Sequence, residues 1–569
     1  MKFVADVTLP ARMEAGCVPV AVHGRAPALY RIPVTLSLMG LFMIAIQAGQ
    51  PLVGFASMMA VLATAAALSL RSMARRYAPA TILRDQGDAK MSNGRYREAR
   101  AFYERALAIV QRELPLNSPE VLSGNYNLAV VSSLLGDHDQ AATCLDALLC
   151  GLGGRVPNAW SGRIAWLLRR IARHHSLHGR HDGAEEACRL ALDLVGDAPG
   201  ADDCTVRSLL NDLAWAYQRA GKLEDAERSF RGALSIHEQY RDMAAALATP
   251  CGAGPGAQQS PYRAPSPKEN PTSGGLDRAV AHSLVGLGWT LFELGRVADA
   301  DASFGRALML ASLSGGPEDA SLRAESLRGQ GTVAFELGRY AEADRCYRRA
   351  ADAPLAGDAP QSIALLLDRA CLACTCGEDP RAEGLLVEAE RRLRTSPGHI
   401  SLSGALHAVW AELRRRQGND KDAHKHSQRA VVLAQEALAQ HPRRASVLAL
   451  AARVHVSRSE LTAAERYGRR AMELLRGSGL PQTHPRSCEV SVAMGELHAA
   501  RGQWDAAEEA FRAALEVRET QLGPQHPALD EILEGLTGVF EATGRTAEQA
   551  DLQQRRDALL HEQPAELAS

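Results

Sequence analysis

The stretch FELGRYAEADRCYRRA, residues 335–350, carries the pattern that decides the fold of this chain. Gly338 marks the point where one helix is expected to end and the next to begin, because glycine adopts a left-handed backbone at little steric cost. Tyr340, Ala343 and Tyr347 then follow at the three- and four-residue spacing that lines one face of a helix. A small Ala on such a face lets two helices approach closely, and the large side chain beside it fills the remaining gap. The stretch therefore predicts the turn and the second helix of a helical hairpin.

The same pattern recurs about every 42 residues along the chain. The turn position is found at eleven places, namely Gly94, Gly136, Gly179, Gly221, Gly295, Gly338, Gly377, Gly418, Ser459, Gly502 and Gly544. An Ala follows five residues later at ten of the eleven places, the exception being Gln549. One hairpin cannot bury its apolar face alone, so neighbouring units must stack. The repeat predicts an all-α solenoid of about eleven helical hairpins.

The array resembles tetratricopeptide repeats (TPRs) of the longer, kinesin-light-chain-like type. The family's small residue of the first helix is found seven positions before the turn, as Gly87, Ala129, Ala214, Gly288, Gly331 and Gly495. A Leu-Gly-x-x-His-Pro connector is present at residues 522–527, with a partial echo at His484-Pro485. The ninth unit departs from the pattern, since Tyr467 comes one place early and Gly468 follows it. The resemblance implies a right-handed solenoid whose stacked first helices line a concave, peptide-binding groove.

The repeats are expected in two blocks. Repeats 1–4 cover residues 80–240, and repeats 5–11 cover residues 277–559. Between them, residues 241–276 are rich in Pro, Gly and Ser without helical periodicity, which predicts a disordered insertion. The last unit replaces the apolar stripe with polar residues, which suits a terminal cap; they are Gln549, Gln553 and Arg556.

An uncharged run precedes the repeats. The 39 residues between Arg31 and Arg71 contain no charge and are rich in Leu, Met, Ile, Val, Phe and Ala. A single helix of that length would measure about 58 Å, roughly twice the hydrocarbon thickness of a bilayer. A turn-forming cluster at residues 48–51 divides the run, so residues 32–70 are predicted to form two transmembrane helices.

Basic residues flank both ends of the run, which favours a hairpin with both ends in the cytoplasm. Residues 1–31 then form a short cytoplasmic tail. Two alternatives are a signal peptide and a single span over residues 52–70 with the first half lying in the interface. Arg supplies 58 of the 64 basic residues, a bias typical of GC-rich bacterial genomes. We therefore expect the bacterial inner membrane, with the repeats facing the cytoplasm.

The composition excludes several classes of function. With 64 basic and 66 acidic side chains, the chain lacks the surplus of positive charge that nucleic-acid binding requires. Eleven scattered cysteines indicate reduced thiols rather than a disulfide framework. The sequence contains no phosphate-binding loop, His-Glu-x-x-His pair or Gly-x-Ser-x-Gly motif. We predict no enzyme, no cofactor, no small-molecule substrate and no nucleic-acid partner.

Two clusters offer possible metal ligands. The thiols are Cys371, Cys374 and Cys376, and the imidazoles are His174, His175, His178 and His181. A structural zinc site needs a fourth ligand, and none lies near the thiols in the sequence. Buried thiols in place of Ala and a solvated helix end explain the two clusters more simply, so no metal site is predicted.

The resemblance places candidate partner-binding residues on three first helices. They are Asn127 and Val130, then Arg169, Arg170 and Arg173, then Asn211, Trp215 and Gln218. An Asn amide can clamp a peptide backbone because it offers both a donor and an acceptor. The alternative is that it bonds a neighbouring repeat.

The arginines could bind an acidic peptide, although solvated surface charge is the common alternative. The sequence predicts a membrane-anchored TPR scaffold or adaptor for protein or peptide partners. Its rivals are a peptide- or metal-sensing regulator and an exported envelope assembly factor.

Overall fold

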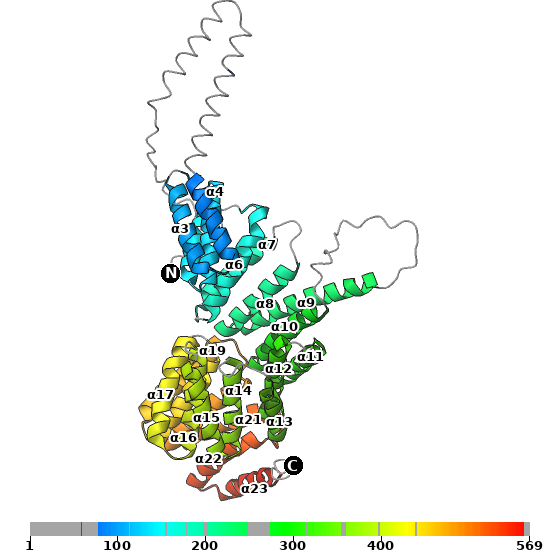
Figure 1. Ribbon diagram of the computed structural model, residues 1–569. Coiled ribbons are helices and arrows are strands. Elements are labelled where there is room, and N and C mark those ends of the chain that lie inside the picture. The colour runs from blue at the N-terminus through cyan, green and yellow to red at the C-terminus, as the bar shows by residue number, and fades with distance from the viewer. Residues whose placement is uncertain are drawn as a thin grey trace, which may run out of the picture. The chain divides into compact units, whose positions relative to one another are not determined.

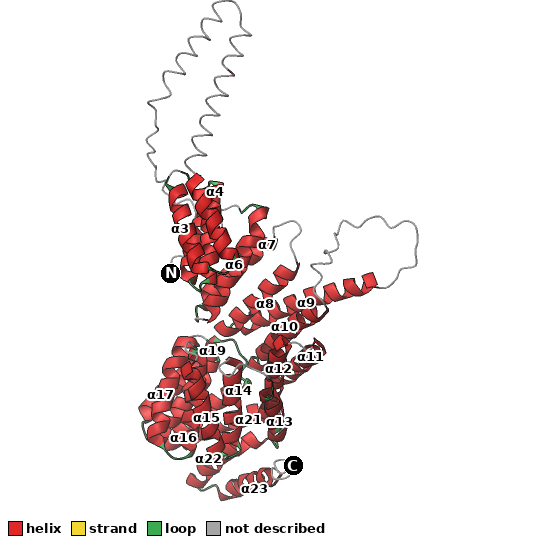
Figure 2. Cartoon of the chain, viewed as in Figure 1, coloured by secondary structure: helices red, strands yellow, loops and turns green. Residues whose placement is uncertain are grey.

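The computed structural model describes Met59 and residues 78–562, apart from residues 113, 154–155, 178, 197–202, 249–272, 315–316, 354–359, 396–398 and 439–440. Within this part of the chain helices are the only regular secondary structure and no strand is found (Figure 2). Residues 78–92 are helical. The helices that follow are α3 (Tyr96–Gln111), α4 (Pro119–Leu134), α5 (His138–Leu152), α6 (Asn158–Leu177), α7 (His181–Gly196), α8 (Asp203–Ala220), α9 (Leu223–Ala248), α10 (Ser273–Glu293), α11 (Val297–Ser314), α12 (Pro317–Glu336), α13 (Tyr340–Ala351), α14 (Pro360–Thr375), α15 (Asp379–Thr395), α16 (Ile400–Arg416), α17 (Asp420–Ala437), α18 (Arg443–Ser457), α19 (Leu461–Gly477), α20 (Pro485–Ala500), α21 (Trp504–Leu522), the short 3-10 helix η1 (Pro527–Leu529), α22 (Asp530–Ala542) and α23 (Thr546–Glu562).

These helices form eleven consecutive pairs over the described ranges, beginning with residues 78–92 and α3 (Figure 1). The all-helical, paired architecture predicted from the repeat is confirmed. Each pair turns at the predicted position. At Gly338, for example, φ is +70°, and the next residue donates its N–H to the carbonyl of Ala334 at 2.8 Å. Ser459 takes the same role with φ +61°, and no other described non-glycine residue has a positive φ.

The anchor alanines explain why the pairs stack. All ten, from Ala99 to Ala507, are completely buried. The large side chain four residues after the Ala is buried beside it in five repeats, as Tyr103, Phe230, Phe304, Tyr347 and Phe511. Each of these rings lies against a glycine of a first helix, where a Cβ would come within 3 Å of the ring. Small and large residues therefore interlock from one repeat to the next.

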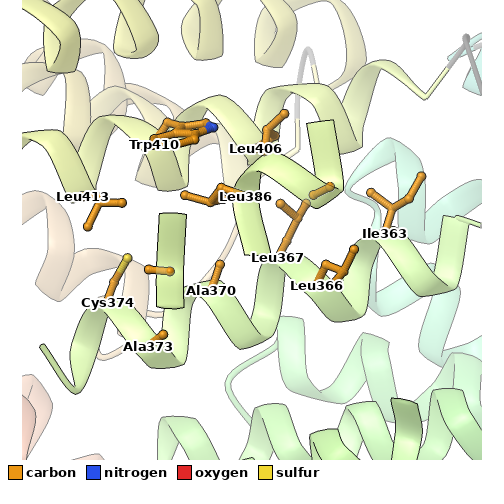
Figure 3. Close-up of a cluster of buried hydrophobic side chains, with 12 residues drawn as sticks. Ile363, Leu366, Leu367, Ala370, Ala373, Cys374, Leu386, Leu406, Trp410 and Leu413 are labelled. Atoms are coloured by element: carbon orange, nitrogen blue, oxygen red, sulfur yellow. The ribbon is translucent and has the colours of Figure 1, made fainter. Parts of the chain in front are cut away.

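The chain divides into two compact units, Met1–His174 with Leu190–Gly200, and His175–Arg189 with Ala201–Ser569. The first unit is centred on fully buried aliphatic side chains of α5 and α6, among them Leu145, Leu148 and Ile164. In the second unit one cluster of this kind joins α14, α15 and α16 (Figure 3). It contains Leu367, Leu386 and Trp410, together with the thiol of Cys374.

The second unit also folds back on itself through two His-Pro connectors. His484 Nε2 donates to the carbonyl oxygen of Glu293 at 2.8 Å, although the two residues are 191 positions apart. His526 Nε2 contacts the carbonyl oxygen of Glu336 in the same way at 3.0 Å. In both histidines Nδ1 accepts the backbone N–H two residues later and so caps the following helix. The connectors at the starts of α20 and η1 thus bind the ends of α10 and α12.

A buried carboxylate strengthens the first of these contacts. The side chain of Glu293 is 1% exposed and forms ion pairs with Arg443 and Arg486. Burial alone would raise the pKa of Glu293, but the two guanidinium charges outweigh it and hold the pKa below its ordinary value. The start of α18 and the start of α20 are therefore both tied to the end of α10.

The segment predicted to be a disordered insertion is helical at both ends. Helix α9 continues to Ala248 and α10 begins at Ser273, so helix covers both ends of the segment 241–276. Ala-rich sequence at residues 244–248 has enough helix propensity to extend α9. Residues 249–272 lie outside the described residues. At the other end of the chain, Gln553 of α23 is exposed and Arg556 Nε donates to Asp530 at 2.8 Å.

No helix within the described ranges has both the length and the hydropathy that a membrane crossing requires. The predicted tail 1–31 and the predicted spans 32–70 lie outside the described residues, except for Met59.

Candidate functional site

A pocket lies between α17, α18 and α19 in the second unit. Its volume is about 590 Å³, and its lining combines an apolar floor with a charged rim. The lining residues are Val431, Gln435, Arg444, Leu448, Thr462, Glu465, Arg466, Tyr467, Arg469, Arg470 and Glu473. A pocket of this size matches a few residues of an extended segment or a small organic group.

The pocket follows from a departure in the ninth repeat. Gly468 stands where other repeats carry a buried ring, and a Cβ at that position would lie 2.5 Å from the sulfur of Met494. Met494 of the next repeat therefore occupies the space of the missing ring. Tyr467, one place earlier, instead stacks on His455 at 5.2 Å and lines the pocket. A one-residue shift moves an aromatic side chain from the core to a pocket wall.

The rim of the pocket carries excess positive charge. Four arginines face two glutamates, and both glutamates are already paired on α19. Glu465 forms an ion pair with Arg469, and Glu473 contacts Arg470 at 2.9 Å. Burial, followed by repulsion from Arg470, lowers the pKa of Arg444. The pocket is thus electrostatically suited to an anionic group.

Arg466 is the rim cation best placed for a ligand. Its guanidinium lies 5.4 Å from the ring centroid of Tyr467, and it forms no ion pair with any described residue. It can therefore receive a carboxylate without first losing a partner, whereas Arg469 and Arg470 already hold one each.

The eight predicted partner-binding residues lie elsewhere. Asn127 and Val130 are on α4, the three arginines at 169, 170 and 173 are on α6, and Asn211, Trp215 and Gln218 are on α8. The residues on α4 and α6 belong to the first unit, and those on α8 belong to the second. None of them lines the pocket.

Contacts to neighbouring repeats account for several of these residues. Arg170 Nε donates to Ser133 Oγ at 2.9 Å, so its guanidinium ties α6 to α4. Asn211 bonds His282 at 3.0 Å and accepts from Ser283 Oγ at 3.1 Å, both on α10. For Asn211 the structure thus shows bonding to a neighbouring repeat, which was the alternative to a peptide clamp.

The remaining predicted residues differ in how far their side chains are exposed to solvent. Trp215 packs edge-to-face on Phe230 at 5.5 Å, and Gln218 is buried. Asn127 is half-buried and its side chain forms no hydrogen bond with the described residues. It stays a prediction for peptide binding.

In the second unit, ion pairs join the first helices of different repeats to one another. Arg453 of α18 binds Glu496 of α20 at 2.8 Å and pairs with Glu531 of α22. Arg415 of α16 lies 3.6 Å from the same Glu531. A ligand on these faces would have to displace partly buried ion pairs, which makes the α17–α19 pocket the more accessible site.

The structure shows the surroundings of one residue in each of the two clusters singled out in the sequence. Cys374 belongs to the apolar cluster of Figure 3, and burial raises its pKa to about 11. His174 stacks on His138 at 4.1 Å, while His178 lies outside the described residues.

Comparisons with known proteins agree with the repeat architecture. The sequence pattern of the tetratricopeptide repeat family matches residues 79–149, 163–239 and 487–555. These three segments are therefore similar to tetratricopeptide repeats. No curated protein matches the sequence significantly.

Three solved structures are similar to parts of this chain at low sequence identity. A Rap protein complexed with competence and sporulation factor has 10% identity and a TM-score of 0.47, covering 71% of this chain and 99% of that one. The Rap conjugation gene regulator of plasmid pLS20, in complex with a Phr peptide, has 11% identity and a TM-score of 0.45, with coverage of 71% and 96%. Yeast Tom70 has 16% identity and a TM-score of 0.30, with coverage of 82% and 96%.

Proposed function

We propose that this TPR protein is a membrane-anchored scaffold that holds a partner protein by an acidic segment in the α17–α19 pocket. The observation that carries the proposal is the charge of the pocket rim, where four arginines surround an apolar floor and both glutamates are already paired. The presence of TPRs supports a protein–protein interaction role. No cofactor is needed for such a role.

The chemistry of the pocket defines the segment it would accept. Arg466 and Arg470 can form charge-assisted hydrogen bonds with carboxylates at the rim. Leu448 and the ring of Tyr467 provide apolar surface below them. A segment with two acidic residues next to an apolar or aromatic residue satisfies both parts.

The anchor is part of the proposal. The uncharged residues 32–70 would hold the chain in the bacterial inner membrane, with the repeats in the cytoplasm. Fractionation of the full chain and of a variant lacking residues 1–78 tests the anchor, because only the full chain should remain in carbonate-washed membranes. Digestion of the repeats by protease added to spheroplasts would instead favour a scaffold outside the cytoplasm, as in an envelope assembly factor.

Binding to the pocket is tested with a fluorescent octapeptide of alternating glutamate and leucine and the full chain in mild detergent. The double variant R466E/R470E should weaken binding at least about tenfold, because it removes attraction and adds repulsion. The matched control is R512E, on the corresponding face of α21, which should leave binding unchanged. Equal loss in both variants, or no loss in either, would exclude the pocket as the site.

A further inference from the structure

Three potential metal ligands meet close to the pocket, where α17, α18 and α19 come together. His424 lies near the start of α17, His455 near the end of α18, and Glu460 immediately before α19. One ligand atom of each lies within 4.8 Å of the others. The rings of His424 and His455 are arranged edge-to-face, with centroids 4.9 Å apart.

Both histidines carry a buried nitrogen with no hydrogen-bond partner in the described part of the chain. These atoms are Nδ1 of His424 and Nε2 of His455. His455 as a residue is only 5% exposed. A buried polar atom without a partner costs about 1–3 kcal/mol, so two of them in one cluster indicate a missing common partner.

The carboxylate is placed to support a metal ion. Glu460 Oε2 lies 2.6 Å from Nδ1 of His455, and Arg458 donates to Oε1 of the same carboxylate at 2.8 Å. Metal-binding histidines commonly donate their second nitrogen to such a carboxylate, which fixes the ring and its tautomer.

The tenth repeat contains an incomplete copy of this arrangement. His498 Nδ1 lies 2.8 Å from Oε1 of Gln503, which corresponds to His455 and Glu460 shifted by 43 residues. The copy has an amide instead of the carboxylate, and Tyr467 stands 43 residues after His424. The hydrogen bond alone is thus a feature of the repeat, whereas the carboxylate and the second histidine belong to repeat 9.

We propose that Nδ1 of His424 and Nε2 of His455 bind a divalent transition-metal ion of the zinc class, with Glu460 orienting the ring of His455 through its other nitrogen. Imidazole nitrogen suits zinc, which binds it at about 2.0–2.1 Å and accepts water in its remaining positions. The site is independent of the proposed partner segment and can be tested without it.

The test is a titration of the full chain in mild detergent with Zn²⁺ in competition with a chromophoric chelator. We expect one tight equivalent per chain. H424N and H455N should each abolish it, and E460Q should weaken it about tenfold or more. The control H498N, in the incomplete copy, should keep the full stoichiometry and affinity.

The E460Q variant is expected to fold, because repeat 10 has the same amide, Gln503, at the corresponding position. A loss of metal binding in E460Q would therefore not be explained by unfolding. Circular dichroism should show equal helix content in all variants. As a second readout, Co²⁺ should give a visible spectrum with the wild-type chain that E460Q alters and H498N does not. A wild-type chain that binds no stoichiometric Zn²⁺, or variants that all bind it equally, would overturn the site. Neither result would affect the anionic pocket, which is probed by peptide binding alone.

Discussion

Repeats 9 and 10 have the same pair of helices but differ in the side chains that pack between neighbouring repeats. In repeat 10, the ring of Phe511 is 2% exposed and fills the space between first helices, against Gly495 and Gly535. In repeat 9 the equivalent residue is Gly468, and Met494 reaches in from the next repeat. The first arrangement closes the core, and the second leaves a pocket beside it.

The charges differ along with the packing. Repeat 9 has Arg466 and Arg470 on the pocket face of α19, where α21 has Glu509 and Ala513. A repeat unit of this chain can thus lose its interlocking ring without losing its helices, since the turn residue Ser459 and the anchor Ala464 are retained. Function can then be built where the packing rule is broken.

The largest effect should come from removing the ring that repeat 10 retains. F511A deletes a buried aromatic side chain and should lower the free energy of unfolding by about 3–5 kcal/mol. Urea denaturation followed by circular dichroism measures the change. M494A, which truncates the substitute for the ring in repeat 9, should cost less; an equal or larger cost would show that the two cores are packed alike.

Acid should weaken the buried histidine caps that the two repeats share: His441 accepts the N–H of Arg443 at the start of α18, and His484 accepts that of Arg486 at the start of α20. Burial, with a contribution from Arg486, lowers the pKa of His484 to about 4, and burial lowers that of His441 to about 3. The unfolded chain binds these protons near pH 6.5, so stability is complete above that pH and falls as the pH drops toward 4. Between pH 7 and pH 5 each histidine should cost about 2 kcal/mol.

Urea midpoints at the two pH values check this expectation. The variants H441N and H484N, one for each repeat, should both reduce the difference between pH 7 and pH 5. If either variant keeps the full pH dependence, its histidine is not buried as a neutral cap.

The smallest effect distinguishes the two glycines that face the core. G495A brings a Cβ to 2.8 Å from the rigid ring of Phe511 and should cost about 1–3 kcal/mol. G468A meets the flexible Met494 and gains helix propensity, so the change should stay within about 1 kcal/mol. The unfolding temperatures of the two single variants, measured side by side, test whether G495A is the less stable of the two. A greater loss for G468A would mean that Met494 is held as firmly as the ring.

Much of the fold could be read from local patterns. The turn residues, the buried alanines and the helical pairs were predictable because each depends on spacing within about 20 residues. Even Ser459, the one departure at the turn, was correctly placed by the repeat. The kinesin-light-chain-like type of the repeat and the membrane anchor stay predictions.

The candidate site was only partly visible in the sequence. The shift of Tyr467 and Gly468 was a detectable departure, but nothing in the sequence showed that it borders a pocket. The proposed metal-binding residues were missed because they come from two helices and the turn before a third, and match no single-segment motif. The sequence did contain one signal for this cluster: the pair His455 and Glu460 recurs 43 residues later as His498 and Gln503, which form the same hydrogen bond. The predicted Arg170 and Asn211 instead bond neighbouring repeats, which only the packing of those repeats could reveal.

The sequence by itself determined the helical hairpins, their turns and the small-to-large interlocking of neighbours, because these depend on side chains close along the chain. The tertiary structure decided how the array closes. His484 and Glu293 meet across 191 residues, a contact set by the summed rotations of the intervening repeats. The pocket is more local, because α17, α18 and α19 follow one another in the chain, but only the packing of the three helices decided which side chains line it.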